Sequence, residues 1–244
     1  MRRFGLIGKK LSHSFSQKYF QNKFKELELN DHEYDLFELN KISSVTEIFS
    51  LSNLLGLNVT VPYKEEIIPF LDILDESAKK VGAVNVVKIT NGRKVGYNSD
   101  YYGFKRSLEE WLPSNFNKNA LVLGTGGASK AVSSALSDLR IEYKCVSRNP
   151  SKNKISYSET DSYLNNEFNL IINTTPLGMS PNIDSLPDIN YNLLTNEHYL
   201  YDLVYNPELT MFLKLGADQG AVVKNGLEML HLQAEESWRI WNSK

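Results

Sequence analysis

The stretch Ala120-Leu-Val-Leu-Gly-Thr-Gly-Gly-Ala-Ser129 decides the fold of this chain. Its four leading apolar residues predict a buried strand, Gly124 and Gly126 predict a tight turn, and a helix is expected over about 128–139. Glycines at such a turn let a pyrophosphate approach the backbone, and the helix N-terminus offers unpaired N–H groups. The pattern therefore predicts a dinucleotide site. Because Ser129 occupies the third glycine position of the fingerprint, a flavodoxin-like domain is the alternative.

Strand-like and helical segments alternate on both sides of this stretch, which indicates an α/β fold with a mainly parallel sheet. In the second part of the chain the predicted strands are 120–124, 141–146, 170–174, 199–204 and 221–223. The strand at 141–146 contains Cys145, the only cysteine, interpreted as a small core residue. This part is expected to be a Rossmann-type, NADP-binding domain covering 101–225.

The first part of the chain is expected to form a second α/β domain. Its predicted strands are 3–8, 32–39, 55–61 and 84–89, and Asn91-Gly92 predicts a hairpin that gives this sheet an antiparallel edge. The segment 101–111 is interpreted as a linking helix. A helix over 227–241 places Leu227, Leu230, Ala234, Trp238 and Trp241 on one face for packing. It is expected to return to the first domain, which then consists of 1–100 and 226–244.

Composition excludes several classes of partner. The 244 residues contain 27 basic and 29 acidic side chains, so the net charge of −2 predicts no binding to nucleic acid or to a membrane surface. No apolar run reaches the roughly 18 residues of a membrane span. A single cysteine favours the cytoplasm, and four scattered histidines predict no metal site. A monomer or a homodimer is expected.

The cofactor preference is predicted from the end of the second strand of the dinucleotide unit. NAD enzymes place an acidic residue there, whereas this chain has Ser147-Arg148-Asn149-Pro150-Ser151-Lys152. A guanidinium suits a 2′-phosphate and can stack on adenine, and Lys152 adds a second cation. NADP is therefore preferred over NAD. The alternative is that both cations are solvated loop residues.

Several further segments follow one another in an order that resembles the shikimate dehydrogenase family along nearly the whole chain. With the glycine loop, the segments that carry this resemblance are His13-Ser14-Phe15-Ser16, Asn58-Val-Thr-Val-Pro-Tyr-Lys64, Gly82-Ala-Val-Asn85, Asn98-Ser-Asp100-Tyr-Tyr-Gly103 and Gly226-Leu-Glu-Met-Leu-His-Leu-Gln233. The resemblance implies that Asn173-Thr-Thr-Pro-Leu-Gly-Met179 and Asp202-Leu-Val-Tyr-Asn-Pro207 are loops that line the nicotinamide side. The resemblance implies reversible, NADPH-dependent reduction of 3-dehydroshikimate to shikimate, on the route to chorismate and the aromatic amino acids.

The resemblance also implies a role for particular residues. Lys64 and Asp100 are expected to be catalytic, because a ketone that receives hydride needs a proton donor within reach. The resemblance places Ser14, Ser16 and Tyr205 at the substrate carboxylate, and Thr60, Asn85 and Gln233 at the ring hydroxyl groups. The expected cofactor-binding residues are Gly124, Gly126, Gly127, Ala128, Ser147, Arg148, Lys152, Thr174 and Gly226.

Some features depart from the family pattern or fit other functions. Lys10-Leu11 and Gln17 replace the usual residues around the two serines, and Ser147 and Asn149 flank the arginine. The alternatives are an NAD-dependent quinate/shikimate dehydrogenase, a non-catalytic NADP sensor and a pterin-linked one-carbon dehydrogenase. For Lys64 and Asp100 the alternative is a salt bridge between domains without chemistry.

Overall fold

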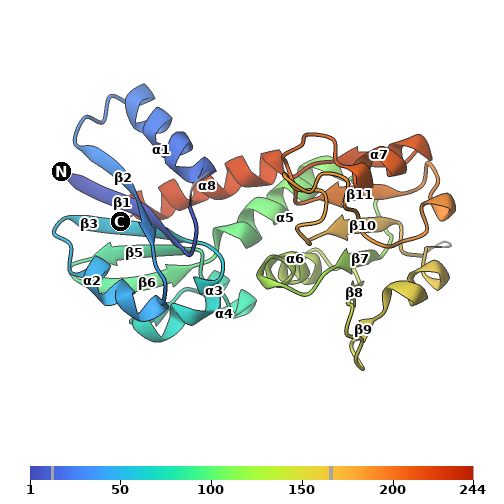
Figure 1. The fold of residues 1–244 in the computed structure, drawn as a ribbon, viewed down its shortest axis with the longest axis horizontal. Helices are drawn as coiled ribbons and strands as arrows, with labels where there is room; N and C mark the ends of the chain where they lie inside the picture. Colours follow the sequence, from blue (N-terminus) through green and yellow to red (C-terminus); the bar gives the residue numbers. More distant parts are fainter. Residues whose placement is uncertain (12–13, 165–166, 244) are drawn as a thin grey trace. The chain divides into compact units, whose positions relative to one another are not determined.

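The computed structural model describes residues 1–11, 14–164 and 167–243. The chain forms two compact units. The first consists of Met1–Tyr102 and Gln233–Lys244, and the second consists of Gly103–Leu232. The boundaries fall inside two helices, α5 (Ser99–Trp111) and α8 (Leu227–Asn242), so both helices contribute residues to each unit (Figure 1). None of the helices in the described part of the chain combines the length and apolar character of a membrane span.

The first unit contains a six-stranded sheet with the order β2-β1-β3-β5-β6-β4. The strands are β1 (Arg2–Gly8), β2 (His32–Glu38), β3 (Leu54–Val59), β4 (Ile73–Leu74), β5 (Val86–Thr90) and β6 (Arg93–Tyr97). β1 is parallel to β2 and β3, whereas β5 is antiparallel to both β3 and β6. The hairpin predicted at Asn91-Gly92 is confirmed, since both residues have positive φ and connect β5 to β6.

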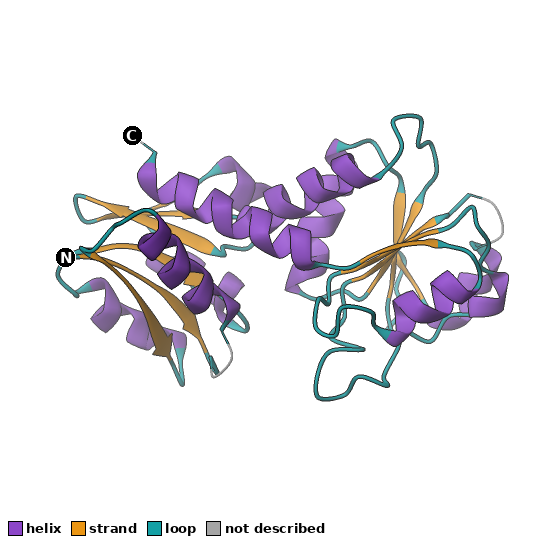
Figure 2. Cartoon of the chain, turned by 90° about the horizontal axis from the view of Figure 1, so that it is seen from above, coloured by secondary structure: helices purple, strands orange, loops and turns teal. Residues whose placement is uncertain are grey.

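Helices lie on both faces of this sheet (Figure 2), and a cluster of buried apolar side chains lies on each face. On one face, the core includes residues of three short helices, α2 (Val45–Phe49), α3 (Tyr63–Glu66) and α4 (Glu76–Val81). On the other face, the core includes residues of α1 (Phe15–Glu26) and the end of α8. The 3-10 helices Ile42–Ser44 and Ile68–Phe70 complete the unit.

The second unit contains a six-stranded, fully parallel sheet with the order β12-β11-β10-β7-β8-β9. The strands are β7 (Ala120–Leu123), β8 (Tyr143–Val146), β9 (Lys154–Ile155), β10 (Leu170–Asn173), β11 (Tyr199–Asp202) and β12 (Val222–Lys224). Numbered within the unit, the order is 3-2-1-4-5-6, as in dinucleotide-binding domains, and not the flavodoxin-like order 2-1-3-4-5. The predicted α/β class is confirmed, and the flavodoxin-like alternative is excluded.

Two helices lie in the crossovers of this sheet, α6 (Gly127–Asp138) between β7 and β8 and α7 (Met211–Asp218) between β11 and β12. The 3-10 helices are Tyr157–Ser162 and Tyr191–Leu193. The main core combines residues of β7, β10 and β11 with residues of α7 and of the loops.

Three local predictions need correction. Leu227 was predicted on the packed face of the last helix, but it is 41% exposed, because it is the first residue of α8. Cys145 was predicted as a core residue, but it is only half-buried in β8, where its Sγ lies 3.8 Å from Ser133 Oγ. The linking helix begins at Ser99, two residues before the predicted start.

Candidate active site

A cavity of about 540 Å³ lies at the carboxyl ends of β7, β8 and β10 in the second unit. Open parallel sheets bind ligands at this edge, where the strand order reverses between the first and fourth strands. The cavity is lined by Gly124, Thr125, Gly126, Val146, Ser147, Arg148, Asn149, Tyr157, Thr174, Thr175, Pro176, Leu177, Leu186 and Asp188. Of the predicted cofactor residues, Gly127, Ala128, Lys152 and Gly226 are not among the described lining residues.

Different physical reasons explain why glycine stands at each position along this edge. Gly124 has a φ of +104°, and a Cβ there would lie 2.9 Å from Thr174 Oγ1, so the fold itself requires glycine. Around Gly126 and Gly127 there is no atom within 4 Å of an added Cβ among the described residues. Open space at the N-terminus of α6 is what a ligand phosphate needs. Ser129, which replaces the third glycine, is buried and donates from Oγ to Gly126 O at 2.7 Å.

The basic end of the cavity is formed by the loop after β8. Arg148 is exposed and lines the cavity, and Ser147 Oγ accepts a hydrogen bond from Asn149 N at 3.1 Å, which fixes the turn around it. The exposed Lys152 follows four residues later. Burial raises the pKa of the Tyr157 hydroxyl, while the nearby charge of Arg148 lowers it.

Three of the lining residues in this region, Tyr157, Leu186 and Asp188, were not predicted. Tyr157 begins a 3-10 helix and the other two residues lie in loops, and all three stand outside the motifs quoted above.

A buried carboxylate connects the loops that follow β10 and β11. Asp202 accepts hydrogen bonds from Asn173 Nδ2 at 2.9 Å, from Val204 N at 3.0 Å and from Thr210 Oγ1 at 2.6 Å. Burial raises the pKa of Asp202 to about 6, although the three donors oppose this shift. Thr210 is also the N-cap of α7. Asp202 therefore holds the loops of the carboxyl edge in place.

Two of the predicted cofactor residues have structural roles in the same region. Thr174 Oγ1 donates to Leu123 O at 2.7 Å and packs against Gly124. A Cβ on Gly226 would lie 2.2 Å from Leu203 O, so internal packing is enough to explain this glycine.

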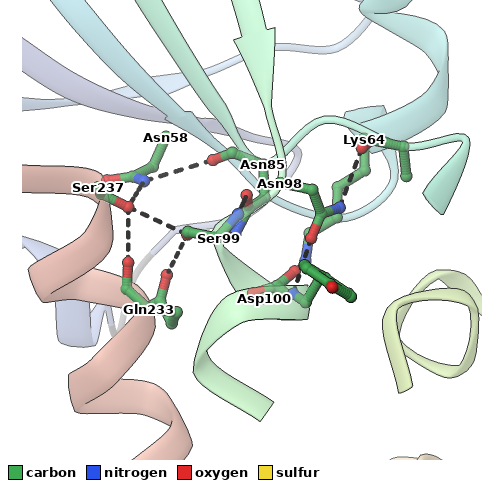
Figure 3. Close-up of polar contacts among 10 residues, drawn as sticks. Asn58, Lys64, Asn85, Asn98, Ser99, Asp100, Gln233 and Ser237 are labelled. Carbon is green, nitrogen blue, oxygen red and sulfur yellow. Dashed lines mark hydrogen bonds and ion pairs between the residues drawn. The ribbon is translucent and has the colours of Figure 1, made fainter. Parts of the chain in front are cut away.

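In the first unit, Lys64 and Asp100 form the ion pair that the sequence indicates as the reacting groups. Lys64 Nζ lies 2.6 Å from Asp100 Oδ2, and the side chains are 19% and 16% exposed (Figure 3). Lys64 is on α3, where its carbonyl accepts from Val84 N at 2.7 Å. Asp100 is in the first turn of α5, where the helix dipole stabilises a carboxylate. Both residues belong to one unit, so the pair is not a salt bridge between domains.

A second group of predicted residues lies beside this pair. Asn85 is buried, and its Oδ1 accepts from Ser99 N at 2.6 Å while its Nδ2 donates to Ser99 Oγ at 3.0 Å. Ser99 Oγ also lies 3.4 Å from Gln233 Oε1 on α8 (Figure 3). Because Ser99 precedes Asp100, these bonds connect the predicted hydroxyl-binding residues to the Lys64–Asp100 ion pair.

The predicted carboxylate-binding serines begin α1. Ser14 is the N-cap of this helix, and its Oγ accepts from Gln17 N at 3.3 Å. The side chain of Ser16 is hydrogen-bonded to the hydroxyl of Tyr34. His13, which belongs to the same motif, lies outside the described residues.

The remaining two predicted substrate residues lie in different units. Thr60 follows β3, where its N–H donates to Ile7 O at 2.9 Å and its carbonyl accepts from Tyr63 N. Tyr205 follows β11 in the second unit, and burial raises the pKa of its hydroxyl. Its role at the substrate carboxylate stays a prediction.

The structure adds three buried polar residues that were given no role. Asn58 and Ser99 stand inside the quoted motifs, and Ser237 lies four residues after Gln233, on the same face of α8. The helical spacing was the available signal for Ser237.

Comparisons with known proteins agree with this geometry. A sequence profile described as the shikimate dehydrogenase substrate binding domain matches residues 6–87. A curated relative from Clostridium beijerinckii, named shikimate dehydrogenase (NADP(+)), is 39% identical over 250 residues, which cover 99% of this chain and 92% of the relative.

Solved structures give the same result. Shikimate dehydrogenase 1 from Peptoclostridium difficile matches with a TM-score of 0.84 at 38% identity, covering 99% of this chain and 91% of that one. The Thermus thermophilus shikimate 5-dehydrogenase, solved in complex with NADP(H) and shikimate, matches with a TM-score of 0.87 at 29% identity, covering 99% and 94%. By sequence and by fold, the chain belongs to the shikimate dehydrogenase family.

Proposed function

We propose that this chain catalyses the reversible, NADPH-dependent reduction of 3-dehydroshikimate to shikimate, on the route to chorismate and the aromatic amino acids. The observation that carries the proposal is the 2.6 Å contact between Lys64 and Asp100. The chain belongs to the shikimate dehydrogenase family, since it is 39% identical to a curated relative named shikimate dehydrogenase (NADP(+)). Both residues stand in motifs of that family.

The chain's part in the reaction is the handling of a proton. Hydride transfer to a ketone leaves negative charge on the carbonyl oxygen, which needs a donor within hydrogen-bond reach. NADPH, when bound, supplies the hydride. The Lys64 ammonium group donates a proton to the oxygen, and Asp100 orients that group by accepting one of its hydrogens. In the reverse direction, Lys64 accepts the proton of the substrate hydroxyl.

The other polar residues of the first unit hold the ring in the proposed complex. Ser14 and Ser16 bind the carboxylate, while Thr60, Asn85 and Gln233 bind the hydroxyl groups. Asn85 supports this assignment, because its buried amide is held at both ends by Ser99. In the described bonds one hydrogen of its Nδ2 remains for a ligand oxygen. Tyr205 adds a contact to the carboxylate.

The cavity of the second unit fits the cofactor in the proposed assignment. Gly126 and Gly127 leave room for the pyrophosphate at the N-terminus of α6. Arg148 provides the positive charge for the 2′-phosphate. Lys152 adds charge from the same loop.

We assign 1–100 and 226–244 to substrate binding and catalysis, and 101–225 to NADP binding. The profile match over residues 6–87 supports the first assignment, and the glycine loop supports the second. The protein is proposed to act in the cytoplasm as a monomer or a homodimer, with shikimate and NADP as its small-molecule partners.

The test is an absorbance assay of the purified protein with shikimate and either NADP⁺ or NAD⁺, followed at the reduced nicotinamide band. Reduction of NADP⁺ in preference to NAD⁺ is expected. Quinate replaces shikimate in a parallel reaction. Faster reaction with quinate and NAD⁺ would assign the chain to the quinate branch, and no reaction with any pair would refute the proposal.

A further inference from the structure

A buried serine outside every recognised motif joins four elements of the first unit. Ser237 on α8 has no solvent-exposed surface. Its Oγ donates to Gln233 O at 2.8 Å, lies 3.0 Å from Asn58 Nδ2 and lies 3.2 Å from Ser99 Oγ (Figure 3). Through Asn58 the same cluster reaches the hydroxyl of Tyr34 at 2.8 Å. The polar cluster thus links β2, β3, α5 and α8.

The direction of these hydrogen bonds follows from the chemistry of the groups. A serine hydroxyl has one hydrogen, and a backbone carbonyl can only accept, so the hydrogen of Ser237 is committed to Gln233 O. Ser237 Oγ therefore accepts from Asn58 Nδ2, and in its contact with Ser99 it can only be the acceptor. Asn58 Oδ1 in turn accepts from Tyr34.

The same reasoning fixes the amide of Asn85. The N–H of Ser99 can only donate, so the group 2.6 Å from it must be Oδ1 of Asn85. Nδ2 then faces Ser99 Oγ at 3.0 Å, and this oxygen accepts only while its own hydrogen points elsewhere. Two acceptors on α8 face that hydrogen, Ser237 Oγ at 3.2 Å and Gln233 Oε1 at 3.4 Å, and Ser237 is the nearer of them. Ser237 thereby keeps Ser99 in the orientation that Asn85 requires.

We infer that Ser237 is a positioning residue for substrate recognition, which acts through Ser99 to keep the amide N–H of Asn85 directed at a ring oxygen of the ligand. The inference rests on the proposed function and deepens it. Gln233, one helical turn before Ser237 on α8, offers Oε1 as the alternative acceptor of the Ser99 hydrogen at 3.4 Å, so Ser99 lies between the two amides that are proposed to bind hydroxyl groups. Asn85 is thus proposed to donate to one ring oxygen of the substrate. For an analogue that has a hydrogen atom in place of that oxygen, Ser237→Ala should not change the binding affinity.

The test combines Ser237→Ala and Asn85→Ala in a double-mutant cycle, with the dissociation constant of shikimate measured by titration and kcat measured separately. Loss of one neutral hydrogen bond predicts about three- to tenfold weaker shikimate binding in Ser237→Ala, with kcat within about twofold of the wild type. In the Asn85→Ala background, Ser237→Ala should change binding by less than about twofold, because the group that it orients is absent.

Ser107→Ala is the matched control. Ser107 is equally buried on α5, and its Oγ contacts Tyr201 and Glu228 in the second unit. Its removal should lower the unfolding midpoint without changing shikimate affinity. Unchanged shikimate binding in Ser237→Ala, or an equal loss with and without Asn85, would overturn the inference. A wild-type protein that does not oxidise shikimate would instead overturn the proposed function, and the inference with it.

Discussion

Among single residues, Lys64 carries the chemical step of the proposed mechanism. Lys64→Met keeps most of the length of the side chain but removes the proton donor. Turnover should fall by roughly a hundredfold to ten-thousandfold, the range typical of a positioned acid or base, while shikimate affinity changes much less. Steady-state kinetics and a direct titration of shikimate measure the two effects.

Two further variants make this prediction specific. Lys79→Met removes an exposed lysine of α4, paired only with the neighbouring Glu76 in the described contacts, and should keep normal turnover. Asp100→Asn should reduce turnover, and combined with Lys64→Met it should lose less than the product of the single effects, because the residues act together. Near-normal turnover of Lys64→Met would mean that another group donates the proton.

Arg148 is the residue that should distinguish the two nicotinamide cofactors. Arg148→Ala should weaken the binding of NADPH by about 1.5–3 kcal/mol, on the order of tenfold to a hundredfold in affinity, because the proposed charge-assisted bond to the 2′-phosphate is lost. NADH lacks this phosphate, so its affinity should fall much less. Fluorescence titration of both reduced cofactors measures the difference. Lys152→Ala should have the smaller effect, since Lys152 is absent from the described cavity lining. Equal weakening of both cofactors would make Arg148 a structural residue.

At the scale of elements, the loop between β7 and α6 contains one glycine needed for folding and another proposed to be needed for cofactor binding. Gly124→Ala forces an alanine to adopt a positive φ against Thr174 and should cost at least about 1–2 kcal/mol of stability. Gly126→Ala finds open space and an extended backbone, so stability should be unchanged within about 0.5 kcal/mol. Its methyl group would nevertheless occupy the proposed position of the pyrophosphate, so the affinity for NADPH should fall.

Thermal unfolding and NADPH titration of the two alanine variants test this separation. A Gly126→Ala protein that binds NADPH normally would contradict the placement of the pyrophosphate.

The elements also show how far local sequence patterns reach. Long periodic segments such as β1 and α8 were predicted close to their observed bounds, and Asn91-Gly92 specified its turn. The two-residue strands β4 and β9 were not predicted, because two residues cannot display an alternation.

The residues of the candidate site could be predicted from the sequence only where they stand in a motif. Lys64 and Asp100 could be paired because each stands in a motif. The contact of Asn85 with Ser99 joins residues 14 apart, and that of Ser99 with Ser237 joins residues 138 apart. Such contacts depend on tertiary packing, which one sequence does not display. Tyr157 and Asp188 likewise line the cavity of the second unit from outside the quoted motifs.

At the scale of the whole molecule, the first unit depends on the last residues of the chain. Trp241 is buried against Phe4 and Phe20, and its indole N–H donates to Val87 O at 3.1 Å. Gly56 lies directly beneath the indole, since a Cβ there would be 2.2 Å from Nε1. The ring therefore fills a space that the sheet leaves open for it.

Trp241→Ala should reduce stability by about 3–5 kcal/mol, as for other large aromatic residues removed from a core. Trp241→Phe should lose less, because it keeps most of the ring contacts and gives up only the bond to Val87 and part of the volume. Denaturant unfolding followed by circular dichroism measures both variants. NADPH affinity should stay close to normal in each, since the cavity proposed to bind the cofactor lies in the second unit. Equal stability of Trp241→Ala and the wild type would contradict the proposed packing.

The division of the first unit between the two ends of the chain has a consequence for synthesis on the ribosome. Residues 1–102 are synthesised before Gly103–Leu232, but the segment that covers Phe4 and Phe20 begins at Gln233 and is synthesised after it. At typical translation rates the intervening residues take on the order of ten seconds to synthesise. During that interval an aromatic surface of the nascent chain stays uncovered and available to chaperones, while Gly103–Leu232 can already begin to fold.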